Sequence, residues 1–317
     1  MGTKIAILGY GAQGSAHAKN MRDEGLDIVI GTRKGNSFDN AISDGFNVTS
    51  LTEAASNAEL IVVGLPDGSH EEILCTKIFP NAKFNSVIGF LHGSSIYFSK
   101  IKIPSKFGIG LLAPKGPGDT LRKTYLNGQG IPALFSVYQD NPQKNTKDIL
   151  FSWGHAIGCS RAALIETTFK DESIIDLFGE QAVLCGGIKL LIERSFLLLV
   201  NRGYPPEIAY QECCQEIKQV TDLIFTKGLT GMLNHISTTA AFGTSAIESI
   251  AKKPLDIAFE KILDEIESGE FIQKFNEDYK NKSELLNNIK NSVPKSLENS
   301  GKKVRDWTPW LFKENIE

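Results

Sequence analysis

The feature that most constrains this chain is a glycine-rich turn between a predicted strand, residues 4–8, and a predicted helix that extends to about residue 24. The turn has the spacing Gly-x-Gly-x-x-Gly, in the run Gly9-Tyr10-Gly11-Ala12-Gln13-Gly14. In such a turn the first glycine permits the bend, the second lets a pyrophosphate approach the backbone, and the third lets the helix pack on the strand. The motif alone is weak evidence, but a second predicted strand follows at residues 27–31.

Strand and helix patterns alternate along the first half of the chain. Apolar runs at residues 59–65, 86–91, 107–112 and 131–137 predict buried strands, and helical patterns separate several of them. This alternation indicates an α/β fold with a Rossmann-type, doubly wound parallel sheet. From residue 172 onward the pattern is almost wholly helical. We therefore predict a dinucleotide-binding domain over residues 1–168 and an all-α domain over residues 169–317.

The end of the second predicted strand discriminates between two dinucleotides. Proteins that prefer NAD place an Asp or Glu there to bind the ribose 2′-hydroxyl, whereas a 2′-phosphate needs cations and hydroxyl donors. Here the acid is missing, and the residues that follow the strand include Arg33, Lys34 and Ser37. We therefore predict NADPH as the cofactor. The alternative is that Arg33 and Lys34 are plain surface charges.

Two further polar residues follow predicted strands. His92 comes directly after the run 86–91, at a carboxyl edge where such sheets bind ligands. Lys115 is restrained by the prolines and glycines of Ala113-Pro114-Lys115-Gly116-Pro117-Gly118, which suits it to a fixed anionic group. The alternatives are a histidine that satisfies a neighbouring backbone group, and a rigid surface turn. We expect the remaining histidines to be structural or solvent-facing: His17, His70, His155 and His235.

Two pairs of carboxylates in the helical half have i, i+4 spacing: Asp176 with Glu180, and Glu212 with Glu216. Side chains at this spacing leave the same face of a helix, one turn apart. Like charges so placed destabilise an isolated helix by roughly 0.2–0.5 kcal/mol, and burial increases the penalty unless a metal or a basic group balances them. Because the first pair lies in a nearly uncharged apolar stretch, we predict buried surroundings and a divalent metal site. The alternative is chance, since acids four residues apart are common on helices.

Composition excludes several classes of protein. The 317 residues are 41% hydrophobic and 22% charged, with a formal net charge of -3, as in an ordinary globular protein. Lys and Arg residues are scattered among as many acids, so we expect no nucleic-acid partner. Five cysteines without a CxxC pair argue against a disulfide framework and a cysteine zinc site. No signal peptide is evident and no apolar run approaches the roughly 18 residues that cross a bilayer, so we expect a cytoplasmic enzyme without a membrane partner.

Taken together, these residues resemble ketol-acid reductoisomerase, the enzyme of valine and isoleucine biosynthesis, in its short class I form with one helical C-terminal domain. The resemblance covers nearly the whole chain. Besides the glycine turn and the Lys115 loop, its most specific parts are Glu166-Thr167-Thr168-Phe169, Asp176-Leu177-Phe178-Gly179-Glu180-Gln181-Ala182-Val183-Leu184-Cys185-Gly186-Gly187, Glu212-Cys213 with Glu216, and Pro309-Trp310-Leu311.

The resemblance implies an NADPH-binding Rossmann domain, a knotted helical domain and two magnesium ions per site. Asp176 would bridge both ions and Glu180 would bind the first. Glu212 and Glu216 would serve the second ion and the substrate. The resemblance assigns the remaining site residues as follows: His92 and Lys115 near the nicotinamide and the metals, Gly118 with the cofactor, and Ser237 on the substrate carboxylate.

The implied substrate is an acetohydroxy acid, 2-acetolactate or 2-aceto-2-hydroxybutyrate, with adjacent hydroxyl and ketone oxygens. Two hard cations can chelate both oxygens and polarise the ketone, so that an alkyl group migrates between neighbouring carbons. Glu216 could donate or accept a proton if the site raises its pKa. Hydride from NADPH then reduces the new ketone to give a 2,3-dihydroxy acid.

In the short form of this family the helical domains interlock, and the second carboxylate pair comes from the partner subunit. The resemblance therefore implies a homodimer with shared active sites, or a larger assembly. The chain departs from the usual residues near the site at Ser15, Ser94, Ser95, Asp119 and Ala241. Two alternatives stay open: a diverged paralogue that acts on another 2-hydroxy-3-keto acid, and a cofactor-binding protein without catalysis. Retention of the four carboxylates with His92 and Lys115 argues against the second.

Overall fold

A computed structural model of the chain describes residues 4–99, 101–281, 283–307 and 309. Trp310 and Leu311, which belong to the family-like ending, lie outside the described residues. Contacts divide the chain into two compact units, Met1–Asp176 and Leu177–Glu317, which we call the N-terminal unit and the helical unit. The division falls within helix α8 (Phe169–Gly179). The sequence-based boundary after residue 168 therefore stays a prediction.

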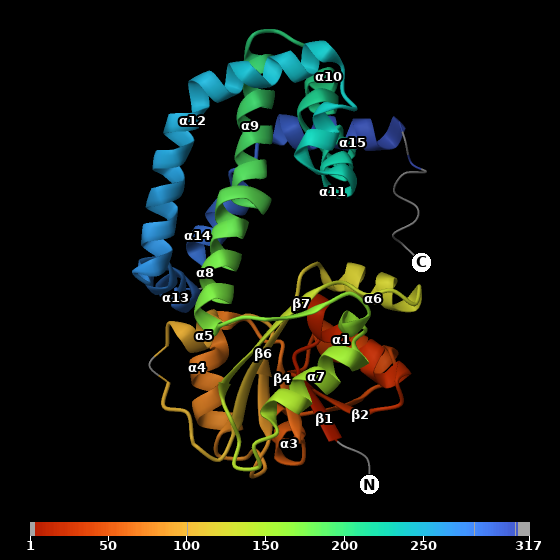
Figure 1. Ribbon diagram of the computed structural model, residues 1–317, viewed down its shortest axis with the longest axis vertical. Helices are drawn as coiled ribbons and strands as arrows, with labels where there is room; N and C mark the ends of the chain where they lie inside the picture. The colour runs from red at the N-terminus through yellow and green to blue at the C-terminus, as the bar shows by residue number, and fades with distance from the viewer. Residues whose placement is uncertain (1–3, 100, 282, 308, 310–317) are drawn as a thin grey trace. The chain divides into compact units, whose positions relative to one another are not determined.

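The N-terminal unit is built on one eight-stranded sheet with the strand order β3-β2-β1-β4-β5-β6-β7-β8 (Figure 1). Every neighbouring pair is parallel except β6 and β7, which are antiparallel. The strands are β1 (Lys4–Leu8), β2 (Asp27–Gly31), β3 (Asn47–Thr49), β4 (Leu60–Val63), β5 (Val87–Phe90), β6 (Gly108–Pro114), β7 (Ala133–Gln139) and β8 (Leu164–Glu166).

Helices cover both faces of this sheet because alternate residues of each central strand point to opposite faces. Ile5 and Ile7 of β1 pack with residues of α1, α6 and α7, whereas Ala6 and Leu8 pack with residues of α3 and α4. The helices of this unit are α1 (Ala12–Asp23), α2 (Asn36–Ser43), α3 (Leu51–Ser56), α4 (His70–Ile73), α5 (Ser94–Tyr97), α6 (Gly118–Leu126) and α7 (Thr146–Ala156), followed by the start of α8.

One strand pair departs from the predicted parallel sheet. Strand β7 begins opposite the last residue of β6, with Ala133 paired to Pro114, and ends opposite Ile109. The segment that follows α6 returns to the carboxyl edge of β6, where the Lys115 backbone N–H donates to the Pro132 carbonyl oxygen. Strand β7 therefore enters the sheet from the edge that β6 leaves, and the two strands run in opposite directions.

The helical unit contains no strand among its described residues. After a π-helical turn, Glu180–Leu184, it comprises α9 (Gly186–Asn201), α10 (Pro206–Tyr210), a second π-helical turn (Gln211–Gln215), α11 (Ile217–Leu233), α12 (Thr238–Glu267), α13 (Glu270–Lys280), α14 (Glu284–Asn291) and α15 (Lys295–Trp307). Its small core joins α9, α10 and α15 through Phe196, Tyr210 and Leu297. The prediction of an α/β Rossmann-type unit followed by an all-α unit is confirmed.

No helix in the described ranges has both the length and the apolar character that a membrane span requires.

Candidate active site

The glycine turn joins β1 to α1 and lies against the turn that follows β4. Gly9 has φ +94, and a Cβ there would overlap the carbonyl oxygen of Gly64. Gly9 is therefore required by the fold itself. Gly11 differs, because its φ is -83 and a Cβ added there would meet no atom of the protein within 4 Å. Nothing in the folded chain demands glycine at this second position, so the open space beside it suits the approach of a ligand.

A hollow of about 510 Å³ lies beside this turn, between the start of α1 and α2. Its lining includes several residues expected to hold the cofactor: Tyr10, Gly11, Ala12 and Ser37. Ser15, one of the departures from the family pattern, lines the same hollow. The Tyr10 hydroxyl donates to Asp44 at 2.7 Å, and Lys19 pairs with the same carboxylate at 3.0 Å. A hydrogen bond and an ion pair therefore connect three of the residues that line the hollow.

The loop that carries Lys115 is attached to the glycine turn. The Gln13 side chain donates from Nε2 to the Gly116 carbonyl oxygen at 2.8 Å. At the start of α6, a Cβ on Gly118 would overlap the carbonyl oxygen of Ala12, so only glycine permits this approach. The N-termini of α1 and α6 therefore lie together, and their unpaired backbone N–H groups favour an anionic ligand.

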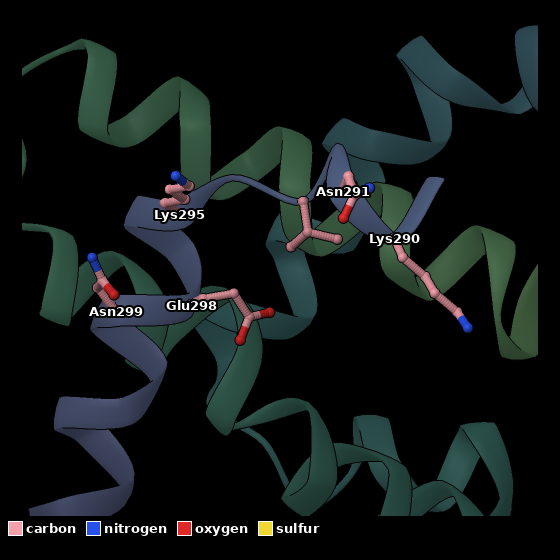
Figure 2. A pocket seen from close by; sticks show the side chains of 6 residues that line it. Lys290, Asn291, Lys295, Glu298 and Asn299 are labelled. Carbon is pink, nitrogen blue, oxygen red and sulfur yellow. The ribbon is translucent and has the colours of Figure 1, made fainter. Parts of the chain in front are cut away.

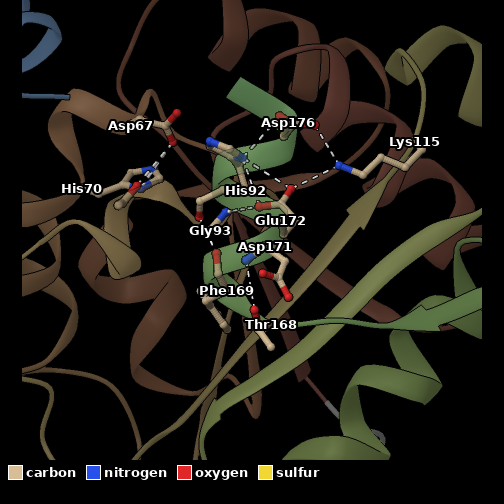
Figure 3. Close-up of polar contacts among 12 residues, drawn as sticks. Asp67, His70, His92, Gly93, Lys115, Thr168, Phe169, Asp171, Glu172 and Asp176 are labelled. Carbon is tan, nitrogen blue, oxygen red and sulfur yellow. Dashed lines mark hydrogen bonds and ion pairs between the residues drawn. The ribbon is translucent and has the colours of Figure 1, made fainter. Parts of the chain in front are cut away.

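Four charged side chains meet at the carboxyl edge of the sheet (Figure 3). Lys115 Nζ lies 2.8 Å from Asp176 Oδ1 and 3.2 Å from Glu172 Oε1. His92 Nδ1 lies 3.2 Å from Glu172 Oε2 and 3.4 Å from Asp176 Oδ2. The backbone N–H of Gly93 also donates to Glu172, at 2.8 Å. We call His92, Lys115, Glu172 and Asp176 the charged cluster.

Sequence reasoning missed Glu172. It lies in the first turn of α8 and is 1% exposed, and it contacts both cations of the charged cluster. The signal was present, because Glu172 precedes Asp176 by the same i, i+4 spacing that links Asp176 to Glu180. What the sequence could not give was the partners, because His92 and Lys115 reach Glu172 from the loops that follow β5 and β6.

The charges of this cluster stabilise one another. Burial alone would raise the pKa of Glu172, but the contacts with His92, Lys115 and the Gly93 N–H outweigh it, so that the pKa lies below 4.5. For His92, burial favours the neutral ring, but the adjacent carboxylates reverse the effect and the pKa is raised above 6.5. Burial likewise opposes the charge of Lys115, and the carboxylates of Asp176 and Glu172 raise its pKa. The basic and acidic side chains of the cluster therefore favour one another's charged forms around a partly open site.

Three of these side chains could also hold a cation. One ligand atom each from His92, Glu172 and Asp176 can be chosen so that all three lie within 4.8 Å of one another. Two of the three are carboxylates, and carboxylate oxygens are the ligands that magnesium prefers. The donor chemistry at Asp176 therefore fits the predicted metal.

The other predicted carboxylates belong to the helical unit. Glu180 and Glu212 each lie in a π-helical turn, a distortion that is frequent at functional sites. Directly after the first of these turns, a Cβ on Gly186 or Gly187 would overlap the carbonyl oxygens of Gln181 and Ala182. The glycine pair is therefore what allows the chain to leave the turn that carries Glu180. Glu216 is half-buried at the start of α11.

The predicted burial around the first carboxylate pair is incomplete in the single chain. Asp176 is 30% exposed, Glu180 is exposed, and Ile175, Val183 and Leu184 around them are exposed apolar residues. The prediction of buried surroundings is borne out only in part for one chain: Ile174, Leu177 and Ala182 are buried, whereas Ile175, Val183 and Leu184 have no apolar cover among the described residues. Convergence of the four predicted metal ligands stays a prediction.

Ser237, the predicted substrate residue, is the N-cap of α12. Its hydroxyl oxygen accepts from the Ala240 N–H at 3.1 Å. Arg33 and Lys34, the predicted 2′-phosphate ligands, are exposed after β2 and form no ion pair with any described residue. Both cations are therefore available to a ligand.

Two of the other histidines are structural, as expected. His17 is fully buried and accepts from Trp153 Nε1 at 3.0 Å, and burial lowers its pKa to about 3. His70 is buried with a contact at each ring nitrogen. His155 and His235 are exposed.

A second hollow, of about 370 Å³, lies in the helical unit between α14 and α15 (Figure 2). Exposed polar side chains dominate its lining: Lys290, Asn291, Lys295, Glu298 and Asn299. None of the predicted site residues lines it.

The fold and the charged cluster together define a protein in which a Rossmann unit with a dinucleotide-type turn precedes a helical unit. Residues 1–163 match the NADPH-binding domain of acetohydroxy acid isomeroreductase, and residues 169–310 match the C-terminal domain of ketol-acid reductoisomerase. The chain therefore belongs to the ketol-acid reductoisomerase family, which serves branched-chain amino-acid biosynthesis.

Solved structures agree with this assignment. The chain is similar to an NADH-preferring ketol-acid reductoisomerase from an uncultured archean, with 35% identity, a TM-score of 0.91, and coverage of 96% of this chain and 94% of that one. A semialdehyde dehydrogenase NAD-binding protein from Cupriavidus necator, solved with calcium and NAD, matches with 15% identity and a TM-score of 0.60, over 83% of this chain and 100% of that one. Pyrroline carboxylate reductase from Plasmodium falciparum, solved with NADP, matches with 18% identity and a TM-score of 0.50, over 84% and 97%. The last two share the fold alone.

Proposed function

We propose that the protein is a magnesium-dependent isomeroreductase that converts 2-acetolactate or 2-aceto-2-hydroxybutyrate into a 2,3-dihydroxy acid. The observation that carries this proposal is the charged cluster, in which Lys115 Nζ lies 2.8 Å from Asp176 and the His92 ring contacts Glu172. The cluster follows β5 and β6 at the carboxyl edge of the sheet, beside the glycine turn, which is where open α/β sheets bind ligands.

The oxygen ligands for two magnesium ions would be Asp176, Glu180, Glu212 and Glu216. Bound magnesium would polarise the adjacent ketone and hydroxyl oxygens of the substrate, and the reduced nicotinamide would supply hydride. The ammonium of Lys115, held between two carboxylates, keeps a positive charge at a fixed place beside Asp176. The His92 ring, whose pKa is raised by the adjacent carboxylates, lies near the same point. Glu216 would donate or accept a proton on the substrate framework.

Ser237 would bind the substrate carboxylate. It caps α12, and the N-terminus of a helix of this length favours an anionic group.

We propose NADPH as the reductant, with its pyrophosphate at Gly9, Tyr10, Gly11, Ala12, Gln13 and Gly14. Gly118 would border the same site, and Arg33, Lys34 and Ser37 would receive the 2′-phosphate. The missing acid after β2 and the unpaired state of both cations among the described residues support this choice. The similar archean enzyme prefers NADH. NADH is therefore the alternative, and a comparison of kcat/KM for the two reductants decides between them.

We propose further that the active unit is a homodimer in which each site takes Glu212 and Glu216 from the partner. The helical unit leaves large apolar side chains of α11 and α12 exposed, with Phe225 92% and Phe242 81% exposed. A monomer rarely exposes apolar surface on this scale, so a second copy of the chain is the natural cover. A larger assembly would use the same face or one beside it.

The test is to follow oxidation of NADPH and of NADH with 2-acetolactate, with and without magnesium, in the wild type and in Asp176→Asn. Magnesium-dependent turnover that Asp176→Asn abolishes supports the proposal. Turnover only on other 2-hydroxy-3-keto acids would show a diverged paralogue instead. Cofactor binding without turnover on any of these acids would show a protein that has lost catalysis.

A further inference from the structure

A second histidine lies close to the charged cluster and has no role in the proposal above. His70 begins α4, after the turn that follows β4, and its ring is buried against Phe90. Its Nε2 lies 2.8 Å from the carbonyl oxygen of Leu65, and its Nδ1 lies 2.6 Å from the hydroxyl oxygen of Ser95. The ring therefore bridges the turn after β4 and the turn after β5.

These partners fix the tautomer of His70. A carbonyl oxygen can only accept, so Nε2 carries the hydrogen. In the neutral ring Nδ1 is then an acceptor, and the Ser95 hydroxyl donates to it at 2.6 Å, with a longer contact of 3.4 Å to Asp67 Oδ1. Burial, the largest influence, lowers the pKa of His70 and keeps the ring neutral. The Asp67 carboxylate lies 3.7 Å from Nδ1, which is too far for a hydrogen bond.

The segment from His92 to Ser95, which leads from β5 into α5, is also attached to α8. The Gly93 N–H donates to Glu172 at 2.8 Å, and a Cβ on Gly93 would lie 2.7 Å from Ser173 Oγ, so α8 packs directly on this turn. His92 precedes Gly93, and Ser95 follows it by two residues. The backbone that carries the His92 ring is therefore attached to α8 through Glu172 (Figure 3). It is attached to the β4 turn through Ser95 of α5 and His70.

We propose that His70 and Ser95 form a positioning pair that holds the turn carrying His92 in the geometry the reaction needs. The inference rests on the proposed isomeroreductase function. Neither residue touches the reacting atoms in this role; both act through the orientation of His92. A displacement of about 1 Å in a supporting residue can reduce turnover by up to about 100-fold, so a pair at this place has a measurable effect.

The decisive variant is Ser95→Ala, which removes one hydroxyl from a half-buried position and leaves the His70 ring in place. We expect kcat on 2-acetolactate with magnesium to fall by roughly 3- to 30-fold, with little change in the KM for the reductant. His70→Gln should give a loss of the same order or smaller, because an amide can serve both partners. His155→Ala is the matched control, since His155 Nδ1 also contacts a serine hydroxyl, Ser160, at 3.0 Å, but on the exposed surface.

A double-mutant cycle separates positioning from general destabilisation. If Ser95 acts through His92, Ser95→Ala should cost nothing further in a His92→Gln background. Equal losses in both backgrounds would overturn the proposal.

Ring NMR of protein labelled with 15N-histidine gives a readout independent of turnover. We expect His70 to be protonated at Nε2 only, and the His92 ring resonances to shift in Ser95→Ala but not in His155→Ala. A different His70 tautomer, or unchanged His92 resonances, would contradict the proposal even if the wild type had no activity on 2-acetolactate. Absence of activity with the expected spectra would instead count against the proposed function.

Discussion

The two units of this chain differ in how completely they bury their apolar side chains and pair their charged ones. In the N-terminal unit, helices cover both faces of the sheet, and strand residues such as Ile7, Leu8 and Ile88 have no exposed surface. In the helical unit the core is confined to α9, α10 and α15, while Phe225 of α11 and Phe242 of α12 are almost fully exposed. The polar groups differ in the same way, since Glu172 is buried among three partners and Glu212 lies exposed on a π-helical turn.

The N-terminal unit therefore pairs the charges of its cluster with its own residues, whereas the helical unit leaves apolar side chains of α11 and α12 exposed. A buried carboxylate is tolerated only with its counter-charges, and those counter-charges are present around Glu172. Exposure of a phenylalanine side chain to water is unfavourable, and burial of the side chain would stabilise the protein. No described residue of the same chain covers Phe225.

The largest effect should come from Glu172→Gln. Neutralising this side chain leaves the Lys115 ammonium and the His92 ring with one carboxylate between them, so we expect kcat to fall by about 100-fold or more. The measurement is steady-state turnover with magnesium, alongside a thermal melt that excludes unfolding. Glu166→Gln is the matched control, because among the described residues Glu166 forms its ion pair with Lys147 alone, at the surface. A Glu172→Gln variant with near-normal turnover would show that the charged cluster is not the site.

The next effect tests the open surface of the helical unit. If a second copy covers α11, Phe225→Asp should raise the dissociation constant of the dimer by at least about 30-fold, which corresponds to about 2 kcal/mol. Sedimentation equilibrium measures this, and activity should fall with dimer content. Phe84→Asp, at a residue of the N-terminal unit that is also exposed, should leave the assembly unchanged. If both variants had the same dissociation constant for the dimer, the helical unit would not differ from the N-terminal unit in this respect.

A smaller effect concerns the glycine turn of the N-terminal unit, where Gly11 borders open space. Gly11→Ala adds a methyl group where the protein has no atom within 4 Å, so the melting temperature should not change. Cofactor affinity should nevertheless fall by roughly tenfold or more, because overpacking by a methyl group costs about 1–3 kcal/mol. Gly118→Ala should lower both quantities, since its methyl group would overlap the Ala12 carbonyl oxygen. Unchanged cofactor affinity in Gly11→Ala would contradict the assignment of this turn to the pyrophosphate.

The smallest effect at neutral pH concerns the buried interior of the same unit. The folded-state pKa of His17, about 3, lies below the ordinary value of 6.5, so the unfolded chain binds the proton more readily. The stability that depends on neutral His17 is therefore fully present above pH 6.5 and is lost as the pH falls, by at most about 1.4 kcal/mol per pH unit. Urea unfolding of the wild type and of His17→Gln between pH 7.5 and 4.5 measures the difference. Parallel curves would mean that His17 does not control acid stability.

Six of the eight strands of the first unit, with the carboxyl-edge positions of His92 and Lys115, followed from local patterns, because short apolar runs and glycine spacing are properties of neighbouring residues. The sequence analysis missed β3 and β8, which have only three residues each and carry no apolar run of that length. The reversal of β7 did not follow, since it depends on a return segment that carries no hydrophobic signal. Glu172 was missed for a related reason: its spacing was visible, but its importance lies in partners that are 57 and 80 residues away.

By itself, the sequence determined that this chain contains a dinucleotide-type turn, an alternating α/β half and an acid-bearing helical half, since each of these is encoded within a few turns of chain. Which acids meet which cations was visible only in the folded chain. The same holds for the open space beside Gly11, where the protein itself would tolerate a larger residue, and for the uncovered apolar side chains of α11 and α12. The physical reason is that charge pairing and burial are set by distances between segments far apart in the chain. No local pattern of residues encodes those distances.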